Sequence, residues 1–166
     1  MKYKTATRAD IPNVITHYKN VISSMNAEGF NIWDNNYPNE EIIINDIINN
    51  HMRILKDEGK IIAASVQNEI QDEKYNEIAW EYNEFPIIIL HRLCVSPEIT
   101  RQGVGSAMLA FLEKEALDNG FKSIRLDAFS KNMRAIKLYE NAGYTKRGHT
   151  YFTKGKFYLY EKTFVL

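Results

Sequence analysis

The sequence predicts a single α/β domain with a mixed β-sheet, and three observations lead to this fold class. First, 166 residues suffice for one domain, residues 1–166, and the 45% share of apolar residues can supply its core. Second, residues 87–129 read as strand, glycine-containing turn, helix and strand, a βαβ unit of parallel strands with a right-handed crossover. Third, the aromatic-rich segments 144–152 and 157–164 predict an antiparallel pair.

The first half of the chain predicts two helices and a hairpin. Apolar residues recur at three- and four-residue steps from Ile11 to Met25, which predicts the first helix. Asp10 is its expected N-cap, and Pro12 lies in its first turn. The elements that follow are a loop at 29–41, a helix at 42–48, and strands at 52–56 and 61–67 joined by a tight turn.

The second half is regular except at its start. Residues 68–86 are polar and ambiguous, and we expect a loop there with one helical turn or the tail of a strand. The nearly continuous apolar run at 87–95 predicts a central strand that is covered on both faces. The remaining elements are a helix from 104 to 118, an alternating strand at 123–129, a helix at 133–142 and the final strand pair.

Composition and cysteine usage exclude several classes of protein. Lys plus Arg equals Asp plus Glu at 21 each, so no overall charge favours a nucleic acid or an anionic membrane as a partner. Cys94 is the only cysteine, which excludes an internal disulfide, and the four histidines lack the spacing of a metal site. The chain shows no apolar signal segment and no apolar run of about 18 to 20 residues, so we expect a cytoplasmic protein.

The stretch "SPEITRQGVGSAMLAF" places Gly103 and Gly105 at the start of a predicted helix. Glycine disfavours a helix, but it lets a ligand approach the backbone, and a helix start offers unpaired N–H groups to an anion such as phosphate. A glycine-rich turn that requires positive φ is the alternative. A Walker loop would need a lysine where this sequence has Ser106, and a dinucleotide-binding loop would need a small residue where it has Met108. The sequence therefore fits neither of these two classes of phosphate-binding loop.

Two motifs resemble those of the GNAT superfamily of acyl-CoA-dependent N-acetyltransferases. The family carries a Gln/Arg-x-x-Gly-x-Gly/Ala loop after its fourth strand, and here "TRQGVG" matches it except at Thr100. About thirty residues later the family carries an Asn-x-x-Ala-x-x-Leu-Tyr-x-x-x-Gly-Phe/Tyr helix, and here "NMRAIKLYENAGY" matches it throughout. The resemblance implies a mostly antiparallel sheet, flanked by helices, whose central parallel strand pair splays apart.

The resemblance also implies a co-substrate and the residues that bind it. Acetyl-CoA would donate its acetyl group to a primary amine by direct transfer within a ternary complex, without a metal. Backbone groups of Leu93, Cys94 and Val95 would bind the pantetheine arm. Asn132 would hydrogen-bond the cofactor, although it is also a good N-cap for the helix that starts at Met133. The pyrophosphate loop would comprise Arg101, Gln102, Gly103, Val104, Gly105 and Ser106.

Tyr139 occupies the position where the family usually keeps the general acid that protonates the leaving thiolate. A phenol is protonated at neutral pH and can donate, but Tyr139 could instead be a core aromatic on the stripe with Ala135. By strand alternation His91 shares a face with Leu93 and is a candidate for the base that deprotonates the amine. The alternatives are that His91 only hydrogen-bonds a neighbouring residue, and that the amine is deprotonated through water. Cys94 alternates away from that face, which favours a core residue over a nucleophile.

The acceptor is the least determined part of the prediction. The family forms its acceptor pocket in the region of Trp33 and Tyr37, although both could simply attach their loop to the core. The acidic residues Glu28, Asp34, Glu40 and Glu41 flank this region and would suit a cationic amine or form a solvated face. A small-molecule amine and a peptide amine both remain open, as does a homodimer. The alternatives to an enzyme are a non-catalytic acyl-CoA sensor or scaffold and an interaction domain.

Overall fold

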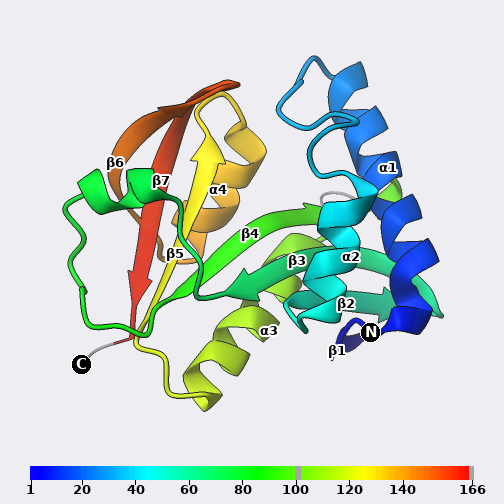
Figure 1. Ribbon diagram of the computed structural model, residues 1–166, viewed down its shortest axis with the longest axis horizontal. Helices are drawn as coiled ribbons and strands as arrows, with labels where there is room; N and C mark the ends of the chain where they lie inside the picture. Colours follow the sequence, from blue (N-terminus) through cyan, green and yellow to red (C-terminus); the bar gives the residue numbers. More distant parts are fainter. Residues whose placement is uncertain (100–101, 165–166) are drawn as a thin grey trace. The chain divides into compact units, whose positions relative to one another are not determined.

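The computed structural model describes residues 1–99 and 102–164, and its helices and strands form two compact units (Figure 1). Unit 1 comprises Met1–Gln67 and Arg92–Phe111; unit 2 comprises Asn68–His91 and the chain from Leu112 onward. The helices are α1 (Ile11–Ala27), α2 (Glu40–Ile48), α3 (Val104–Asp118) and α4 (Met133–Asn141), with short 3-10 helices η1 (Arg8–Asp10), η2 (Glu73–Glu77) and η3 (Pro97–Ile99). In the described ranges, no helix has the length and apolar character to cross a membrane.

Seven strands pair in the order β1-β2-β3-β4-β5-β7-β6. They are β1 (Lys2–Thr5), β2 (Met52–Asp57), β3 (Lys60–Asn68), β4 (Ile88–Val95), β5 (Ser123–Phe129), β6 (Thr145–Phe152) and β7 (Gly155–Thr163). β4 and β5 pair in parallel through Ile88 with Ile124 and Ile89 with Arg125, whereas β1 with β2, β2 with β3, and β7 with both β5 and β6 pair antiparallel. The predicted fold class, a mixed sheet with a central parallel pair, is confirmed.

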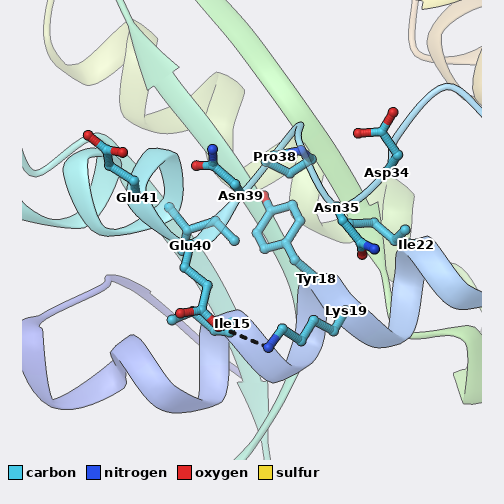
Figure 2. Close-up of a pocket in the computed structure, with 11 residues that line it drawn as sticks. Ile15, Tyr18, Lys19, Ile22, Asp34, Asn35, Pro38, Asn39, Glu40 and Glu41 are labelled. Carbon is cyan, nitrogen blue, oxygen red and sulfur yellow. Dashed lines mark hydrogen bonds and ion pairs between the residues drawn. The ribbon is translucent and has the colours of Figure 1, made fainter.

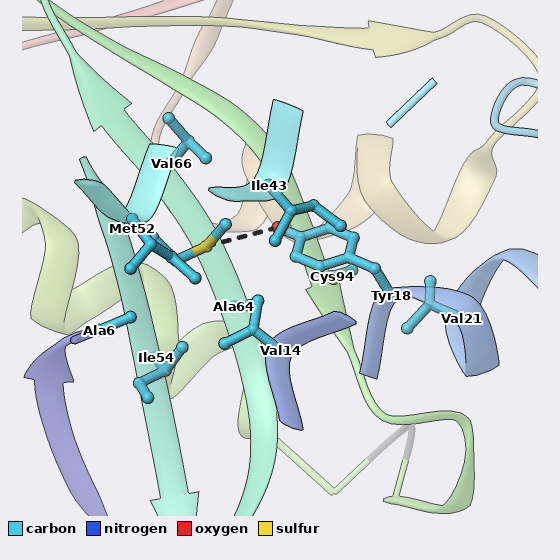
Figure 3. Close-up of a cluster of buried hydrophobic side chains, with 11 residues drawn as sticks. Ala6, Val14, Tyr18, Val21, Ile43, Met52, Ile54, Ala64, Val66 and Cys94 are labelled. Atoms are coloured by element: carbon cyan, nitrogen blue, oxygen red, sulfur yellow. Dashed lines mark hydrogen bonds between the residues drawn. The ribbon is translucent and has the colours of Figure 1, made fainter. Parts of the chain in front are cut away.

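The core of unit 1 lies between helices α1 and α2 and the strands β2 and β3 (Figure 3). The apolar stripe that predicted α1 is the face that packs here, through Val14, Tyr18 and Val21. The strands contribute Met52 and Ile54 together with residues of β3. Burial of a stripe at helical spacing therefore explains why this segment folds as predicted from its sequence.

Strand β1 was not predicted, because "KYKT" contains one apolar residue and shows no periodicity. Its conformation comes from its neighbour, since Tyr3 pairs with Leu55 in the antiparallel register with β2. The ring of Tyr3 also stacks on Phe111 of α3, with a centroid separation of 5.1 Å. Both partners lie more than fifty residues away in sequence, where a local pattern cannot show them.

Asp10 is the N-cap residue of α1 as predicted, but its side chain makes no capping hydrogen bond to this helix. Its carboxylate turns back to accept the backbone N–H of Thr7 at 2.8 Å and forms ion pairs with Lys4 at 3.0 Å and Lys56 at 2.8 Å. The hydrogen bonds from these partners hold the pKa of Asp10 below its usual range although burial opposes this. Asp10 therefore joins η1 to strands β1 and β2.

In unit 2, two buried charged residues bind the long connection between β3 and β4. They are Arg125 of β5 and Glu161 of β7, which lie opposite each other in the antiparallel pair. Arg125 donates to the backbone oxygen of Tyr82 at 2.7 Å and lies over the ring of Trp80. Glu161 accepts from the backbone N–H groups of Glu81 and Tyr82 at 2.9 and 3.1 Å. We call this pair the backbone anchor.

Candidate functional site

The predicted phosphate loop starts helix α3 in unit 1. Gly103 has φ +76°, so the turn itself requires glycine there, and a Cβ at this position would meet no atom within 4 Å. Gly105 lies in the first turn of α3, where a helical backbone does not require glycine. The first N–H groups of the helix have no partner within the helix itself, which suits an anion. Arg101 lies outside the described residues.

The backbone bends within β4 just before the predicted pantetheine segment. Arg92 has φ +51°, a left-handed conformation, so the strict alternation that placed His91 on the same face as Leu93 does not continue through it. Leu93 and Val95 are half-buried, whereas Cys94 is buried in the unit 1 core.

The Cys94 thiol packs against the imidazole of His17, with 3.3 Å between Sγ and Nε2. Burial raises the pKa of Cys94 to about 12 and lowers the pKa of His17 to about 4. Both side chains are therefore neutral at physiological pH. This state suits a core contact rather than a thiolate nucleophile.

A pocket of about 460 Å³ opens in unit 1 between α1, the α1–α2 loop and α2 (Figure 2). Tyr18 is fully buried at this pocket, and its hydroxyl donates to the backbone oxygen of Arg92 in β4 at 2.9 Å. Asp34 and Glu41 are among the lining residues, and Glu40 forms an ion pair there with Lys19 at 2.9 Å. The other lining residues are Ile15, Ile22, Asn35, Pro38, Asn39 and Ile43.

Trp33 and Tyr37, the predicted acceptor residues, attach the α1–α2 loop to unit 1. Trp33 packs against the core cluster, with its ring centroid 6.0 Å from that of Tyr18. The Tyr37 hydroxyl accepts a hydrogen bond from Arg92 Nη1 at 2.8 Å, and the guanidinium lies 5.5 Å from the Tyr37 ring centroid. Their neighbours Asp34 and Pro38 supply the pocket lining.

Two predicted residues of α4 lie in unit 2. The Asn132 side-chain oxygen accepts the backbone N–H of Ala135 at 3.2 Å, so Asn132 caps the helix as the alternative interpretation expected. Tyr139 is buried, and its ring contacts Tyr144 and Tyr160 at centroid separations of 5.9 and 6.2 Å. Tyr139 is thus both the family-motif residue and a member of an aromatic cluster.

His91, also in unit 2, contacts Asn68, with 2.9 Å between Nε2 and Oδ1. The same Oδ1 accepts the backbone N–H of Ile70 at 3.0 Å, which identifies this atom as the amide oxygen. An oxygen that accepts from both groups requires that His91 Nε2 carry a proton. The basic lone pair of the neutral ring is therefore on Nδ1.

Sequence reasoning missed a buried carboxyl–phenol pair in unit 2. Tyr75 of η2 donates to Asp127 of β5 at 2.7 Å. Burial raises the pKa of Asp127, against the opposing effect of the Tyr75 hydrogen bond. The available signal was the alternation of β5, which puts Ser123, Arg125 and Asp127 on one face of a strand in a central position. In the described parts of the chain, no three His, Cys, Asp or Glu side chains group as a metal site.

Comparison of the fold with solved structures gives matches over nearly the whole chain. A GNAT-family acetyltransferase from Streptococcus agalactiae matches with a TM-score of 0.86 and 19% identity, covering 98% of this chain and 94% of that one. The ribosomal-protein-S18-alanine N-acetyltransferase of Escherichia coli matches with 0.74 and 17%, covering 99% and 94%. The paia N-acetyltransferase of Thermoplasma acidophilum, in complex with coenzyme A, matches with 0.75 and 17%, covering 98% and 98%.

The fold defined by these matches is that of an acetyltransferase. The model of the Acetyltransferase (GNAT) family matches residues 21–144 of the sequence. The chain belongs to the GNAT acetyltransferase family, and the predicted family resemblance is confirmed. Among curated proteins, no sequence matches this chain.

Proposed function

We propose that this protein transfers an acetyl group from acetyl-CoA to a primary amine by direct attack of the amine on the thioester. The observation that carries the proposal is the start of α3, where a Cβ at Gly103 would meet no atom within 4 Å and the first N–H groups have no partner within the helix itself. The pyrophosphate of the donor would lie against Gln102–Ser106, and backbone groups of Leu93, Cys94 and Val95 would bind its pantetheine arm. The coenzyme A held by the Thermoplasma relative supports this choice of co-substrate.

Calorimetric titration with acetyl-CoA tests the donor site. In Gly105→Trp the indole should fill the space at the helix start and abolish saturable binding. Gly105→Ala is the matched control for folding, because alanine favours a helix over glycine by about 1 kcal/mol, so reduced affinity in a more stable protein would come from the site itself. Saturable binding that survives in Gly105→Trp would contradict the proposed loop.

The acceptor site we propose is the unit 1 pocket, whose lining carboxylates suit a cationic amine. Acetyl transfer should be measured with spermidine, free lysine and a peptide that starts with alanine, the last because the Escherichia coli relative is named for an alanine acceptor. Thiol release that depends on one of these amines would establish the enzyme. Acetyl-CoA binding without transfer to any of them would favour the alternative of a non-catalytic sensor.

Tyr139 is proposed as the acid that protonates the coenzyme A thiolate. Tyr139→Phe keeps the ring among Tyr144 and Tyr160 and removes only the hydroxyl. We expect kcat to fall by about 10²-fold or more, the usual size of a general-acid contribution, with acetyl-CoA affinity unchanged. Unaltered turnover under conditions where the chemical step limits the rate would remove this role.

His91 is proposed as the base, acting through Nδ1 because Asn68 holds a proton on Nε2. Asn68→Asp would place a carboxylate beside the ring and stabilise the imidazolium, which raises the pKa of His91. A base must be deprotonated to act, so the acidic limb of the pH–rate profile should move to higher pH. A profile that stays the same in both Asn68→Asp and His91→Gln would exclude His91 and favour water or another group.

A further inference from the structure

All three walls of the unit 1 pocket contact the same residue of β4, Arg92. From α1, the Tyr18 hydroxyl donates to the Arg92 backbone oxygen at 2.9 Å. From the α1–α2 loop, the Tyr37 hydroxyl accepts from Arg92 Nη1 at 2.8 Å. From α2, the carboxylate of Asp46 forms an ion pair with Arg92 Nη2. We call these four residues the Arg92 clasp.

Within the clasp, Tyr37 is exposed but the ion pair between Arg92 and Asp46 is largely buried, which makes its geometry specific. The side chains of Arg92 and Asp46 are only 10% and 13% exposed, so their charges are removed from most of the water that would otherwise solvate them. A planar guanidinium reaches two partners in fixed directions, and here it bonds a carboxylate and a phenol while lying against the ring of Tyr37. Loss of the bond to Asp46 or to Tyr37 would leave the Arg92 guanidinium with fewer partners.

The backbone of Arg92 is also unusual. Its φ of +51° is unfavourable for a residue with a side chain, and such conformations persist only where surrounding contacts hold them. The Tyr18 hydrogen bond to the Arg92 carbonyl and the side-chain bonds to Tyr37 and Asp46 are such contacts. Arg92 directly precedes residues 93–95, so the bend and the clasp lie where the proposed donor segment begins.

We propose that Arg92 is a positioning residue that joins the acceptor pocket to the donor strand. The clasp holds α1, the α1–α2 loop and α2 on β4, so that an amine in the pocket meets residues 93–95 at a fixed distance and angle. This role rests on the proposed function, and Arg92 itself touches no reacting atom. Small errors in the position of a nucleophile are costly, because misplacement by about 1 Å can slow a reaction about 10²-fold.

Arg92→Gly removes the side-chain contacts of the clasp but keeps the backbone bend. Glycine adopts φ +51° without strain and keeps the carbonyl that Tyr18 contacts, but it removes both side-chain arms. In this variant we expect kcat/KM for the best amine of the panel to fall by about tenfold to 10²-fold, with the loss shared between a higher amine KM and a lower kcat. The acetyl-CoA dissociation constant, measured by calorimetry without amine, should change by less than about twofold, since the donor contacts are backbone groups.

Conservative variants test the side-chain contacts that Arg92 makes with Tyr37 and Asp46. Arg92→Lys keeps the charge but cannot bond Tyr37 and Asp46 in the same fork, so it should recover only part of the lost rate. Tyr37→Phe should lower kcat/KM in the wild-type background and have no further effect in Arg92→Gly, because both changes remove the same contact. Additive losses would contradict the clasp.

Hydrogen exchange gives a readout that needs no acceptor. Amides of residues 33–46 should exchange faster in Arg92→Gly than in the wild type, while those of unit 2 should not change. If the wild type transfers acetyl to no amine of the panel, the proposed function fails, and unchanged exchange at 33–46 then overturns the clasp while faster exchange supports it. With an active wild type, unchanged amine kinetics in Arg92→Gly, or an equal loss of acetyl-CoA affinity, overturns the proposal.

Discussion

Unit 1 and unit 2 each contain a buried arginine on an interior strand, and the two arginines hold their surroundings in different ways. Arg92 in unit 1 bonds to side chains, the carboxylate of Asp46 and the hydroxyl of Tyr37. Arg125 in unit 2 bonds to the backbone oxygen of Tyr82, and its cross-strand neighbour Glu161 accepts backbone N–H groups of the same segment. Arg125 also donates to the side-chain oxygen of Gln71 at 2.9 Å and lies over the ring of Trp80. What distinguishes unit 2 is that Arg125 and Glu161 bind backbone groups of residues 81 and 82 in addition to side chains.

This difference has a physical consequence for mutation. A contact between two side chains is lost when either residue changes. A contact to a peptide group survives substitution of the residue that supplies it, except by proline, which lacks the N–H. The unit 1 clasp should therefore be sensitive at both of its ends. The backbone anchor of unit 2 should be sensitive at Arg125 and Glu161 and much less sensitive at residues 81 and 82, which it binds through their backbone groups.

The largest effect should come from Glu161→Gln. The two carboxylate oxygens of Glu161 accept from the backbone N–H groups of Glu81 and Tyr82 and from Arg147 Nε, and an amide would turn one of these oxygens into a donor that faces other donors. We expect the free energy of unfolding, measured with urea at pH 7, to fall by about 3 kcal/mol or more, the usual cost of breaking a buried charge network.

Glu81→Gln is the matched control in the anchored segment. The Glu81 side chain makes an exposed ion pair with Arg147, whereas its contact to Glu161 is made by the backbone N–H. Such exposed pairs contribute about 0 to 1 kcal/mol, so this variant should remain close to the wild type. Equal losses in Glu81→Gln and Glu161→Gln would break the distinction between the two kinds of contact.

The next effect concerns acid stability and should be specific to unit 1. Burial lowers the pKa of His17 to about 4, while an unfolded chain has a histidine pKa near its ordinary value of 6.5. Between these values the unfolded chain binds a proton that the folded chain does not, so stability falls as pH falls through this window. The loss should reach about 2.5 kcal/mol by pH 4.5 relative to pH 7.5 in urea unfolding series.

His17→Gln should remove this contribution, because glutamine cannot take up a proton in this range. His149→Gln, the same substitution at an exposed position of unit 2, is the control. Asp10 does not obscure the measurement, because its lowered pKa makes its contribution disappear only as pH falls below the ordinary range of an aspartate. Identical slopes in both variants would place the acid sensitivity outside the unit 1 core.

The smallest effect on stability should come from Asn132, whose contact in unit 2 is local. Asn132→Ala removes the cap on the Ala135 N–H and should cost about 1 kcal/mol of unfolding free energy. Asn132→Asp keeps a capping oxygen and should cost little. If Asn132 also hydrogen-bonds the co-substrate, the aspartate should still weaken acetyl-CoA binding, because its charge repels an anionic ligand. Calorimetry on both variants separates the two roles, and unchanged affinity in both would leave Asn132 only its capping role.

Local patterns in the sequence predicted the elements that local physics determines. The apolar stripe from Ile11 to Met25 and the alternation of 123–129 are present within single segments, and they became α1 and β5. β1 and the connection at 68–86 could not be predicted in this way. β1 is defined by its pairing with β2. The connection is held by Arg125 and Glu161, which lie 43 residues beyond Tyr82 and 80 residues beyond Glu81.

The residues of the candidate site also fall into two groups, those that a short sequence motif predicts and those that depend on contacts distant in sequence. The glycines of the phosphate loop and the cap at Asn132 belong to short motifs, and short motifs are visible in one sequence. The clasp was not visible, because the alternation rule assumes an unbroken pleat and the bend at Arg92 ends that pleat. The Tyr75–Asp127 pair was missed because Tyr75 lies in the polar connection that gave no pattern.

The backbone anchor also makes the β3–β4 connection suitable for display of foreign sequences. Arg125 and Glu161 hydrogen-bond to backbone groups of residues 81 and 82. A library with random residues at the exposed positions Glu73, Glu77 and Glu84 would therefore leave these hydrogen bonds intact. Binding peptides selected there would be presented in a constrained shape, which lowers the entropy that a flexible loop loses on binding. A long polar connection on a GNAT-family scaffold would thereby serve as a graft site.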